Sequence, residues 1–147
     1  MIKDIDIVIY GATGFTGQLC VKYFQSLDLD IKWAIAGRNL GKLENVASKF
    51  STNVEILVAD SDDEKALKDI CSRSKVVLST AGPFHRYGSK LVATCIENDS
   101  HYVDITGENF WVKGLIEKHH KEAARKGIRI IPSCGFDSIP SDIGTFF

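Results

Sequence analysis

Three glycines spaced three residues apart follow a short apolar segment near the start of the chain. The turn reads Gly11-Ala12-Thr13-Gly14-Phe15-Thr16-Gly17, with the β-branched run 5–10 before it and apolar residues at helical spacing, 18–24, after it. This order of strand, glycine-rich turn and helix is typical of the phosphate-binding turn of dinucleotide folds. We expect Gly11 to permit the tight turn, Gly14 to admit a pyrophosphate and Gly17 to pack the helix on the sheet. The spacing is GxxGxxG, not GxGxxG, so the motif alone also fits a structural turn without a ligand.

Apolar runs and amphipathic segments alternate along the rest of the chain. This alternation predicts a doubly wound, mostly parallel sheet of the α/β class, a Rossmann fold, in which ligands bind outside the carboxyl ends of the strands. The predicted strands are 5–10, 31–36, 54–59, 76–80, 101–105 and 128–131, and the predicted helices are 18–24, 42–50, 62–71, 87–98 and 110–126.

A basic residue stands where dinucleotide folds select between NAD and NADP. The second apolar run ends at Gly37-Arg38, about 20 residues beyond the glycine turn. A carboxylate at this position binds the 2′-hydroxyl of NAD, whereas a guanidinium binds the 2′-phosphate of NADP through paired donors. We expect Lys42, one helical turn further on, to add a second positive charge. The sequence therefore favours NADP(H) over NAD(H), the alternative being that Arg38 is a solvated surface charge.

Two further loops follow predicted strands on the same side of the sheet. Asp60 ends the third strand, where its carboxylate can accept a hydrogen bond from an adenine amino group or cap the next helix. Ala81-Gly82 keeps bulky side chains away from the end of the fourth strand, so backbone can lie against the cofactor there or form a plain turn. The predicted cofactor-binding residues are Gly11, Thr13, Gly14, Phe15, Thr16, Gly17, Arg38, Lys42, Asp60, Ala81 and Gly82.

The later loops carry polar groups that could face a substrate. Asp104, Thr106 and Glu108 follow the fifth strand, where they can orient a substrate or cap a helix. Asp104 is the better functional candidate, whereas capping suits Glu108 equally well. His85 either faces the cleft or is a solvated loop histidine. Cys134 follows the sixth strand without a histidine partner, so we do not predict a nucleophile there.

The sequence assigns no catalytic residue and no metal site. Short-chain dehydrogenases donate a proton through a Tyr-x-x-x-Lys pair, but Tyr87-Gly88-Ser89-Lys90 has one residue too few and no other tyrosine has a lysine at this spacing. The cysteines at 20, 71, 95 and 134 form neither a CxxC pair nor a cluster with histidine, so core packing is the simplest role for the first three.

Composition narrows the class of protein. The 147 residues allow one domain, and 44% hydrophobic and 25% charged residues are ordinary values for a globular protein. A net charge of −1 gives no reason to expect nucleic-acid binding. The apolar runs are strand-sized, so none is expected to cross a membrane, and the chain enters its first strand without a signal peptide. With separated, reduced cysteines, this predicts a cytoplasmic location.

Taken together, the loop motifs resemble those of the saccharopine dehydrogenase-like oxidoreductases, in particular the branch that includes trans-acting enoyl reductases. The resemblance runs from residue 5 to residue 142. It rests on Gly11–Gly17, Ala36–Arg38, Ala81–Phe84 with Tyr87-Gly88, Tyr102–Glu108 and Gly135–Asp142.

The resemblance implies an NADP(H)-dependent oxidoreductase that transfers hydride to a C=C or C=N bond of a small-molecule substrate. Members of this family continue into a second domain, and many form homo-oligomers. We therefore interpret residues 1–147 as the NAD(P)-binding domain of a longer two-domain enzyme, able to bind cofactor but inactive alone. Pro140 and Asp142 predict a helix start inside an apolar C-terminal segment. The alternative function is a non-catalytic NADP(H)-sensing or interaction module.

Overall fold

A computed structural model of the chain describes residues 3–27 and 29–147, over which strands and helices alternate. The elements are β1 (Ile5–Tyr10), α1 (Phe15–Ser26), β2 (Trp33–Gly37), α2 (Leu40–Lys49), β3 (Glu55–Val58), α3 (Glu64–Arg73), β4 (Ser74–Ser79), α4 (Phe84–Glu97), β5 (His101–Asp104), α5 (Asn109–Lys126), β6 (Ile130–Ile131) and α6 (Ile139–Phe146).

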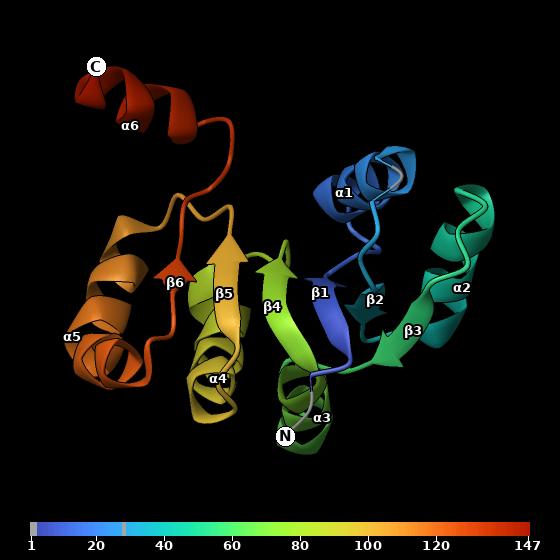
Figure 1. Cartoon of the computed structure of the whole chain (residues 1–147), viewed down its shortest axis with the longest axis horizontal. Coiled ribbons are helices and arrows are strands. Elements are labelled where there is room, and N and C mark those ends of the chain that lie inside the picture. Colours follow the sequence, from blue (N-terminus) through green and yellow to red (C-terminus); the bar gives the residue numbers. More distant parts are fainter. Residues whose placement is uncertain (1–2, 28) are drawn as a thin grey trace.

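The strands form one parallel sheet in the order β3-β2-β1-β4-β5-β6 (Figure 1). In the centre, Ile9 of β1 lies opposite Ile35 of β2 on one side and Leu78 of β4 on the other. The strand order therefore reverses beside β1, which creates the topological switch point at which doubly wound sheets bind ligands. The predicted Rossmann fold is confirmed.

Helices cover both faces of the sheet, and each face has its own apolar core. On one face, Val21 of α1 and Leu43 of α2 pack against Ile9 and Ile35. On the opposite face, a larger cluster joins α3, α4 and α5 to the sheet through fully or nearly fully buried side chains, among them Leu67, Ile70, Leu91, Val92, Leu115 and Tyr102. Burial on both faces explains why the central strands read as continuous apolar runs.

Several predicted boundaries differ from the structure by two or three residues, among them the start of α1 at Phe15 and of β6 at Ile130, and two of the differences have identifiable reasons. The strand predicted over 31–36 begins only at Trp33, because the Lys32 carbonyl accepts the N–H groups of both Asp6 and Ile7 and the regular ladder starts after it. The helix predicted from Tyr87 begins at Phe84, one turn earlier. Its first N–H groups are satisfied by a side chain from a distant loop, which local spacing does not reveal.

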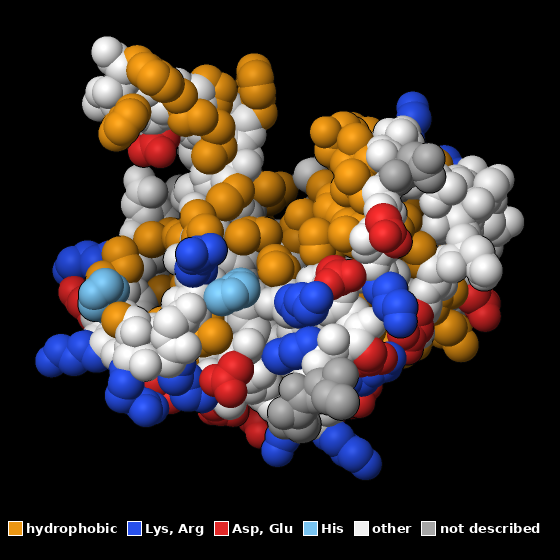
Figure 2. All heavy atoms as spheres, in the orientation of Figure 1, with side chains coloured by type: hydrophobic (Ala, Val, Ile, Leu, Met, Phe, Trp, Pro, Cys, Tyr) orange, Lys and Arg blue, Asp and Glu red, His pale blue; other side chains and the backbone are white. Residues whose placement is uncertain are grey.

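Helix α6 stands apart from the sheet and has no buried residue (Figure 1). The predicted helix start is confirmed, since Pro140 occupies its first turn. Phe146 and Phe147 are 86% and 97% exposed. Figure 2 shows apolar side chains gathered on α6 and α1, on either side of a hollow at one end of the molecule.

The cysteines behave as small apolar residues in this fold. Cys71 and Cys95 are buried as expected, with their Sγ atoms 3.5 Å apart, whereas Cys20 is only partly buried. Within residues 3–27 and 29–147, no group of three or more potential metal ligands occurs. No helix in the same ranges is long and apolar enough to cross a membrane.

Candidate dinucleotide site

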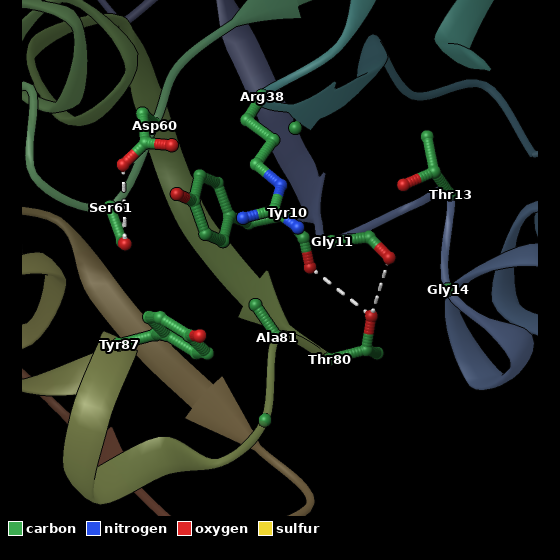
Figure 3. Close-up of a pocket in the computed structure, with 12 residues that line it drawn as sticks. Tyr10, Gly11, Thr13, Gly14, Arg38, Asp60, Ser61, Thr80, Ala81 and Tyr87 are labelled. Atoms are coloured by element: carbon green, nitrogen blue, oxygen red, sulfur yellow. Dashed lines mark hydrogen bonds between the residues drawn. The ribbon is translucent and has the colours of Figure 1, made fainter.

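A groove lies at the switch point, where the loops after β1, β2, β3 and β4 meet (Figure 3). Its volume is about 240 Å³. The residues that line it are Tyr10, Gly11, Thr13, Gly14, Gly37, Arg38, Asp60, Ser61, Thr80, Ala81, Gly82 and Tyr87. Of the predicted cofactor residues, the groove thus brings together Gly11, Thr13, Gly14, Arg38, Asp60, Ala81 and Gly82.

The glycine turn is packed so tightly that side chains are excluded at two positions. Gly11 has a φ of +83°, and a Cβ there would lie 2.9 Å from the backbone nitrogen of Ala81. A Cβ on Gly17 would overlap the carbonyl oxygen of Gly11 and lie 2.8 Å from the Cα of Ala12. These are the turn and packing roles that the sequence predicted for Gly11 and Gly17.

The first turn of α1 is left free to bind an anion. Gly14 is its N-cap residue and provides no side-chain cap, and no acidic residue stands in the first turn. By contrast, Asn39 caps α2 by accepting the Lys42 N–H at 2.9 Å, and Asp63 caps α3 by accepting the Ala66 N–H at 3.0 Å. Unpaired N–H groups and the positive end of the helix dipole therefore remain available beside the groove.

Arg38 leaves the end of β2 and reaches over Tyr10, with Asp60 and Ser61 on the far side of that ring (Figure 3). The Arg38 side chain forms no ion pair with any residue in the described ranges. Tyr10 itself is buried, and this burial raises the pKa of its phenol, so it stays neutral under the groove. The guanidinium donors are thus available for a ligand phosphate.

Asp60 organises the loop that follows β3. Its Oδ1 accepts the backbone N–H of Asp62 at 3.0 Å and the Ser61 hydroxyl at 3.5 Å. The helix cap that the sequence offered as its alternative role belongs to Asp63. One side of the Asp60 carboxylate therefore shapes the turn, and the residue still lines the groove.

Sequence reasoning missed Thr80, the residue that joins the two central loops. Its hydroxyl lies 3.2 Å from the carbonyl oxygen of Tyr10 and 3.1 Å from that of Gly11 (Figure 3). Tyr10, Ser61 and Tyr87 were also not expected to line the groove. Thr80, Tyr10 and Ser61 lie at or next to predicted strand ends, which was the only local signal for such a role. Tyr87 begins a predicted helix and carried no such signal.

Four predicted cofactor residues lie outside the groove lining: Phe15, Thr16, Gly17 and Lys42. Phe15 is 83% exposed on the first turn of α1. Gly17 acts through packing, as described above. Lys42 begins the body of α2 and is exposed.

Asp104 belongs to the interior and not to a substrate site. It is 1% exposed and accepts hydrogen bonds from the Tyr102 hydroxyl at 2.9 Å and from the N–H groups of Thr106 and Ser133, each at 3.0 Å. Burial raises the pKa of this carboxyl, although these hydrogen bonds act in the opposite direction. Asp104 therefore ties the loop after β5 to the loop after β6, which corrects the expectation that it orients a substrate.

Glu108 caps a helix, but not the helix that follows it. Its carboxylate accepts the N–H groups of Phe84 and His85 at 2.7 and 2.8 Å, and so satisfies the first turn of α4. His85 is consequently the second residue of a helix, paired with Glu108, and not a solvated loop histidine. Burial raises the pKa of the partly buried Cys134 thiol, which agrees with assigning it no nucleophilic role.

The groove fits NADP by its donor set. Pyrophosphate and 2′-phosphate binding require the features found here: glycines at positions 11 and 14, a helix N-terminus without a side-chain cap, and a guanidinium with no ion pair among residues 3–27 and 29–147. No carboxylate stands at the end of β2, where an NAD site has one.

Residues 7–131 match the saccharopine dehydrogenase NADP binding domain family. The chain belongs to this family. The NADP cofactor expected from Arg38 is thereby confirmed, and the family is one of oxidoreductases.

Relatives extend well beyond this domain. The chain is 41% identical over 147 residues to a trans-acting enoyl reductase of Mycobacterium leprae, covering 98% of this chain and 35% of the relative. It is 36% identical over 151 residues to a lipid droplet localized protein of Caenorhabditis elegans, covering 97% and 35%. The chain thus spans about a third of the length of these relatives.

A solved structure shares the fold. Saccharopine dehydrogenase (L-Glu forming) from Saccharomyces cerevisiae, in its apo form, superposes with a TM-score of 0.75 at 20% identity. The alignment covers 91% of this chain and 28% of that enzyme. At this identity, the likeness supports the Rossmann architecture alone.

Proposed function

We propose that this chain is the NADP(H)-binding part of an oxidoreductase that transfers hydride between the nicotinamide and a conjugated C=C bond, or a C=N bond, of a small molecule. The observation that carries the proposal is the meeting of an uncapped glycine turn and an unpaired Arg38 in one groove at the switch point. The name enoyl reductase, borne by relatives at about 40% identity, supports a C=C substrate.

Each side of the groove has a separate task in this proposal. The N–H groups at the start of α1 hold the pyrophosphate, with Gly14 leaving room for it. Arg38 holds the 2′-phosphate, and Asp60 accepts a hydrogen bond from the adenine. The backbone of Ala81 and Gly82 supports the other half of the cofactor. The bound cofactor supplies the hydride, and the protein fixes its position and excludes water.

Cofactor choice is the sharpest test. A charge-assisted contact contributes about 1.5–3 kcal/mol, and about 1.4 kcal/mol is tenfold in affinity, so NADPH should bind roughly ten- to a hundredfold more tightly than NADH. Calorimetric titration of the wild type and Arg38→Ala measures this ratio. The variant should lose most of the preference, whereas Lys42→Ala, outside the groove, should keep most of it. Equal affinities of the wild type for both cofactors would contradict the proposal.

A non-catalytic NADP(H) sensor is the second candidate, because the sequence lacks a Tyr-x-x-x-Lys pair. The loss of NADPH absorbance separates the two functions. The assay uses the longest natural polypeptide that contains this domain, with a trans-2-enoyl thioester and a cyclic imine as acceptors. Turnover of either acceptor supports the oxidoreductase. Cofactor binding with turnover of neither acceptor supports the sensor.

A further inference from the structure

His85, in the first turn of α4, and Glu108, in the loop after β5, form a pair at the carboxyl ends of the strands. The Glu108 carboxylate, 22% exposed, is fixed by the backbone N–H groups of Phe84 and His85. Its Oε2 also lies 2.6 Å from Nδ1 of the His85 ring. The carboxylate therefore does more than cap α4, because it sets the orientation of an imidazole.

The opposite side of the ring is open. His85 is 50% exposed, and Nε2 has no hydrogen-bond partner among residues 3–27 and 29–147. The ring of Phe110 lies beside the imidazole, with 5.6 Å between centroids. His85 is thus held at Nδ1 and along its side, and its second nitrogen is presented to solvent.

The negative charge of Glu108 determines which nitrogen of the His85 ring carries a hydrogen. Burial raises the pKa of this carboxyl, but the two backbone N–H donors and the His85 ring outweigh that effect and lower it below its ordinary value. An ionised Glu108 accepts a proton shared with Nδ1, so Nδ1 carries the hydrogen and Nε2 is the nitrogen that gains or loses one. This is the arrangement of an imidazole prepared for proton transfer.

The His85–Glu108 pair lies on the side of the switch point where the nicotinamide half of a cofactor is expected. Arg38 and Asp60 mark the adenosine half of the groove, above β2 and β3. In a doubly wound fold, the second mononucleotide half lies on the other side of the switch point, above β4 and β5. His85 follows the groove residue Gly82 by three positions, and Glu108 stands in the loop after β5.

We propose that His85, with its ring fixed by Glu108, is the general acid of the reduction. The proposal rests on the proposed function. A bound reduced nicotinamide would supply hydride to one atom of the polarised double bond, and the imidazolium form of His85 would give its Nε2 proton to the other atom. The neutral imidazole then regains a proton from water. General acid catalysis of this kind contributes about 10²–10⁴-fold to the rate.

Labelled histidine rings provide a direct test in the chain itself. Imidazole signals are followed by NMR during titration with NADP⁺ and, separately, with 2′-phospho-ADP-ribose, which lacks only the nicotinamide. The His85 ring should shift with NADP⁺ and remain nearly unchanged with the truncated compound. His119 and His120, on α5, serve as internal controls and should respond to neither.

The two compounds also separate the two proposals. If neither binds, the proposed function fails. If both bind and the His85 signals respond identically, His85 does not face the nicotinamide, and the general-acid assignment is overturned while cofactor binding stands.

Two substitutions distinguish a chemical role from a capping role. His85→Asn keeps a donor near the position of Nδ1 and removes Nε2. The equilibrium constant of unfolding and the dissociation constant of NADP⁺ should therefore each change by less than about threefold. In the turnover assay above, the same variant should lower kcat by about a hundredfold or more with KM nearly unchanged. His85→Gln, which places an amide donor near Nε2 but cannot release a proton, should not recover this loss, and a recovery would show that the ring acts only as a hydrogen-bond donor. A fully active His85→Asn enzyme would refute the proposal.

Discussion

The hydroxyl of Thr80 lies 3.1 Å from the carbonyl oxygen of Gly11, and this contact ties the end of β4 to the glycine turn. The same hydroxyl lies 3.2 Å from the Tyr10 carbonyl, whose oxygen also accepts the Thr80 N–H at 2.9 Å. Because Gly11 has no Cβ, the two loops approach closely enough for these bonds. The shape of the cofactor groove therefore depends on a contact between residues that are 69 positions apart.

Thr80→Val tests this contact. Valine keeps the shape of the side chain and removes the hydroxyl, so we expect the free energy of unfolding to fall by about 1 kcal/mol. NADPH affinity should fall as well, because the turn loses its tie to β4. Urea denaturation and calorimetric titration measure both quantities. Thr80→Ser restores the hydroxyl and should behave nearly as the wild type; equal losses in both variants would show that the hydroxyl is not responsible.

The two later glycines of the turn should respond differently to a side chain. Gly14 has an ordinary φ of −73°, and a Cβ there would lie 3.4 Å from the Gly11 oxygen, so Gly14→Val should fold. Its side chain occupies the space of the pyrophosphate, and NADPH binding should be lost. Gly17→Ala instead forces backbone apart and should cost about 1–3 kcal/mol of stability. Circular dichroism and titration separate the outcomes, and normal NADPH binding by folded Gly14→Val would make the motif purely structural.

The fold and half of the site follow from patterns that are local in sequence. The apolar run 5–10 and the glycines after it determine β1 and its turn, and Arg38 follows β2 at the spacing of the ribose-binding position. Those features depend on neighbouring residues alone, because helix and strand periodicity and glycine geometry are local properties.

Several of the missed features depend on contacts between distant segments. Glu108 was expected either to orient a substrate or to cap the helix that follows it, yet its carboxylate caps the start of α4, 24 residues upstream. Asp104 was expected to face a substrate, but it accepts the N–H of Ser133, 29 residues away. Lys42 has the charge and spacing of a phosphate ligand and still lies outside the groove. Side-chain direction at a loop is set by the partner that the fold supplies, which spacing does not reveal.

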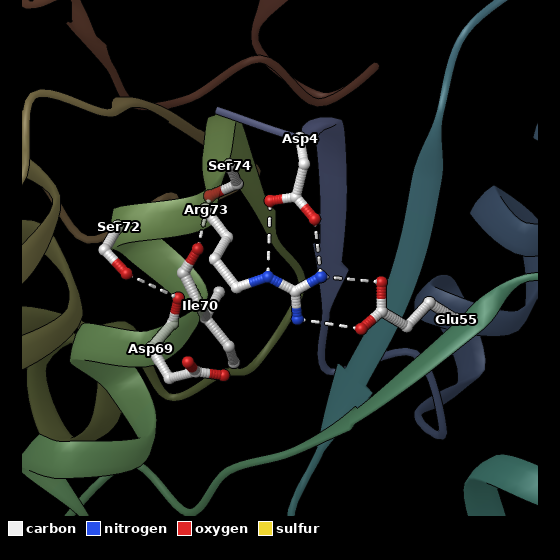
Figure 4. A network of polar contacts seen from close by, with 7 residues as sticks. All are labelled: Asp4, Glu55, Asp69, Ile70, Ser72, Arg73 and Ser74. Carbon is white, nitrogen blue, oxygen red and sulfur yellow. Dashed lines mark hydrogen bonds and ion pairs between the residues drawn. The ribbon is translucent and has the colours of Figure 1, made fainter. Parts of the chain in front are cut away.

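An ion-pair network at the amino ends of β1, β3 and β4 should make the stability of the fold depend on pH. Arg73 binds Asp4 and Glu55 through paired hydrogen bonds, at 2.7 Å and 2.8 Å for the shortest contact to each (Figure 4). Hydrogen bonding to Arg73 holds the pKa of Asp4 below its ordinary value of 3.8. A lowered carboxyl pKa stabilises the fold above 3.8, and the effect is lost as the pH falls through the lowered value.

Arg73→Ala should therefore have a lower free energy of unfolding than the wild type at pH 6. This difference, the stability gap, should become smaller as the pH falls below 3.8. Urea denaturation at pH 6 and at low pH measures the gap. High salt should also narrow it, since the partners are partly exposed. Lys65→Ala, on the exposed side of α3, is the matched control and should change little at either pH. A gap that does not depend on pH would show that Arg73 acts by packing alone.

The exposed apolar face of α6 should drive self-association of the chain. Ile143 is 48% exposed, Phe146 86% and Phe147 97%, and α6 has no buried residue. Burial of a side chain such as phenylalanine is favourable by about 1.5–3 kcal/mol, so this helix should seek an apolar surface, including one on a second copy. Light scattering after size-exclusion chromatography should show oligomers whose fraction rises with concentration. The double variant Phe146→Ser, Phe147→Ser should shift the protein towards monomer, whereas Val58→Ser, on the distant edge strand β3, should not. A wild-type chain that stays monomeric at all concentrations would contradict this prediction, because two aromatic side chains would then remain in water without any measurable drive to bury them.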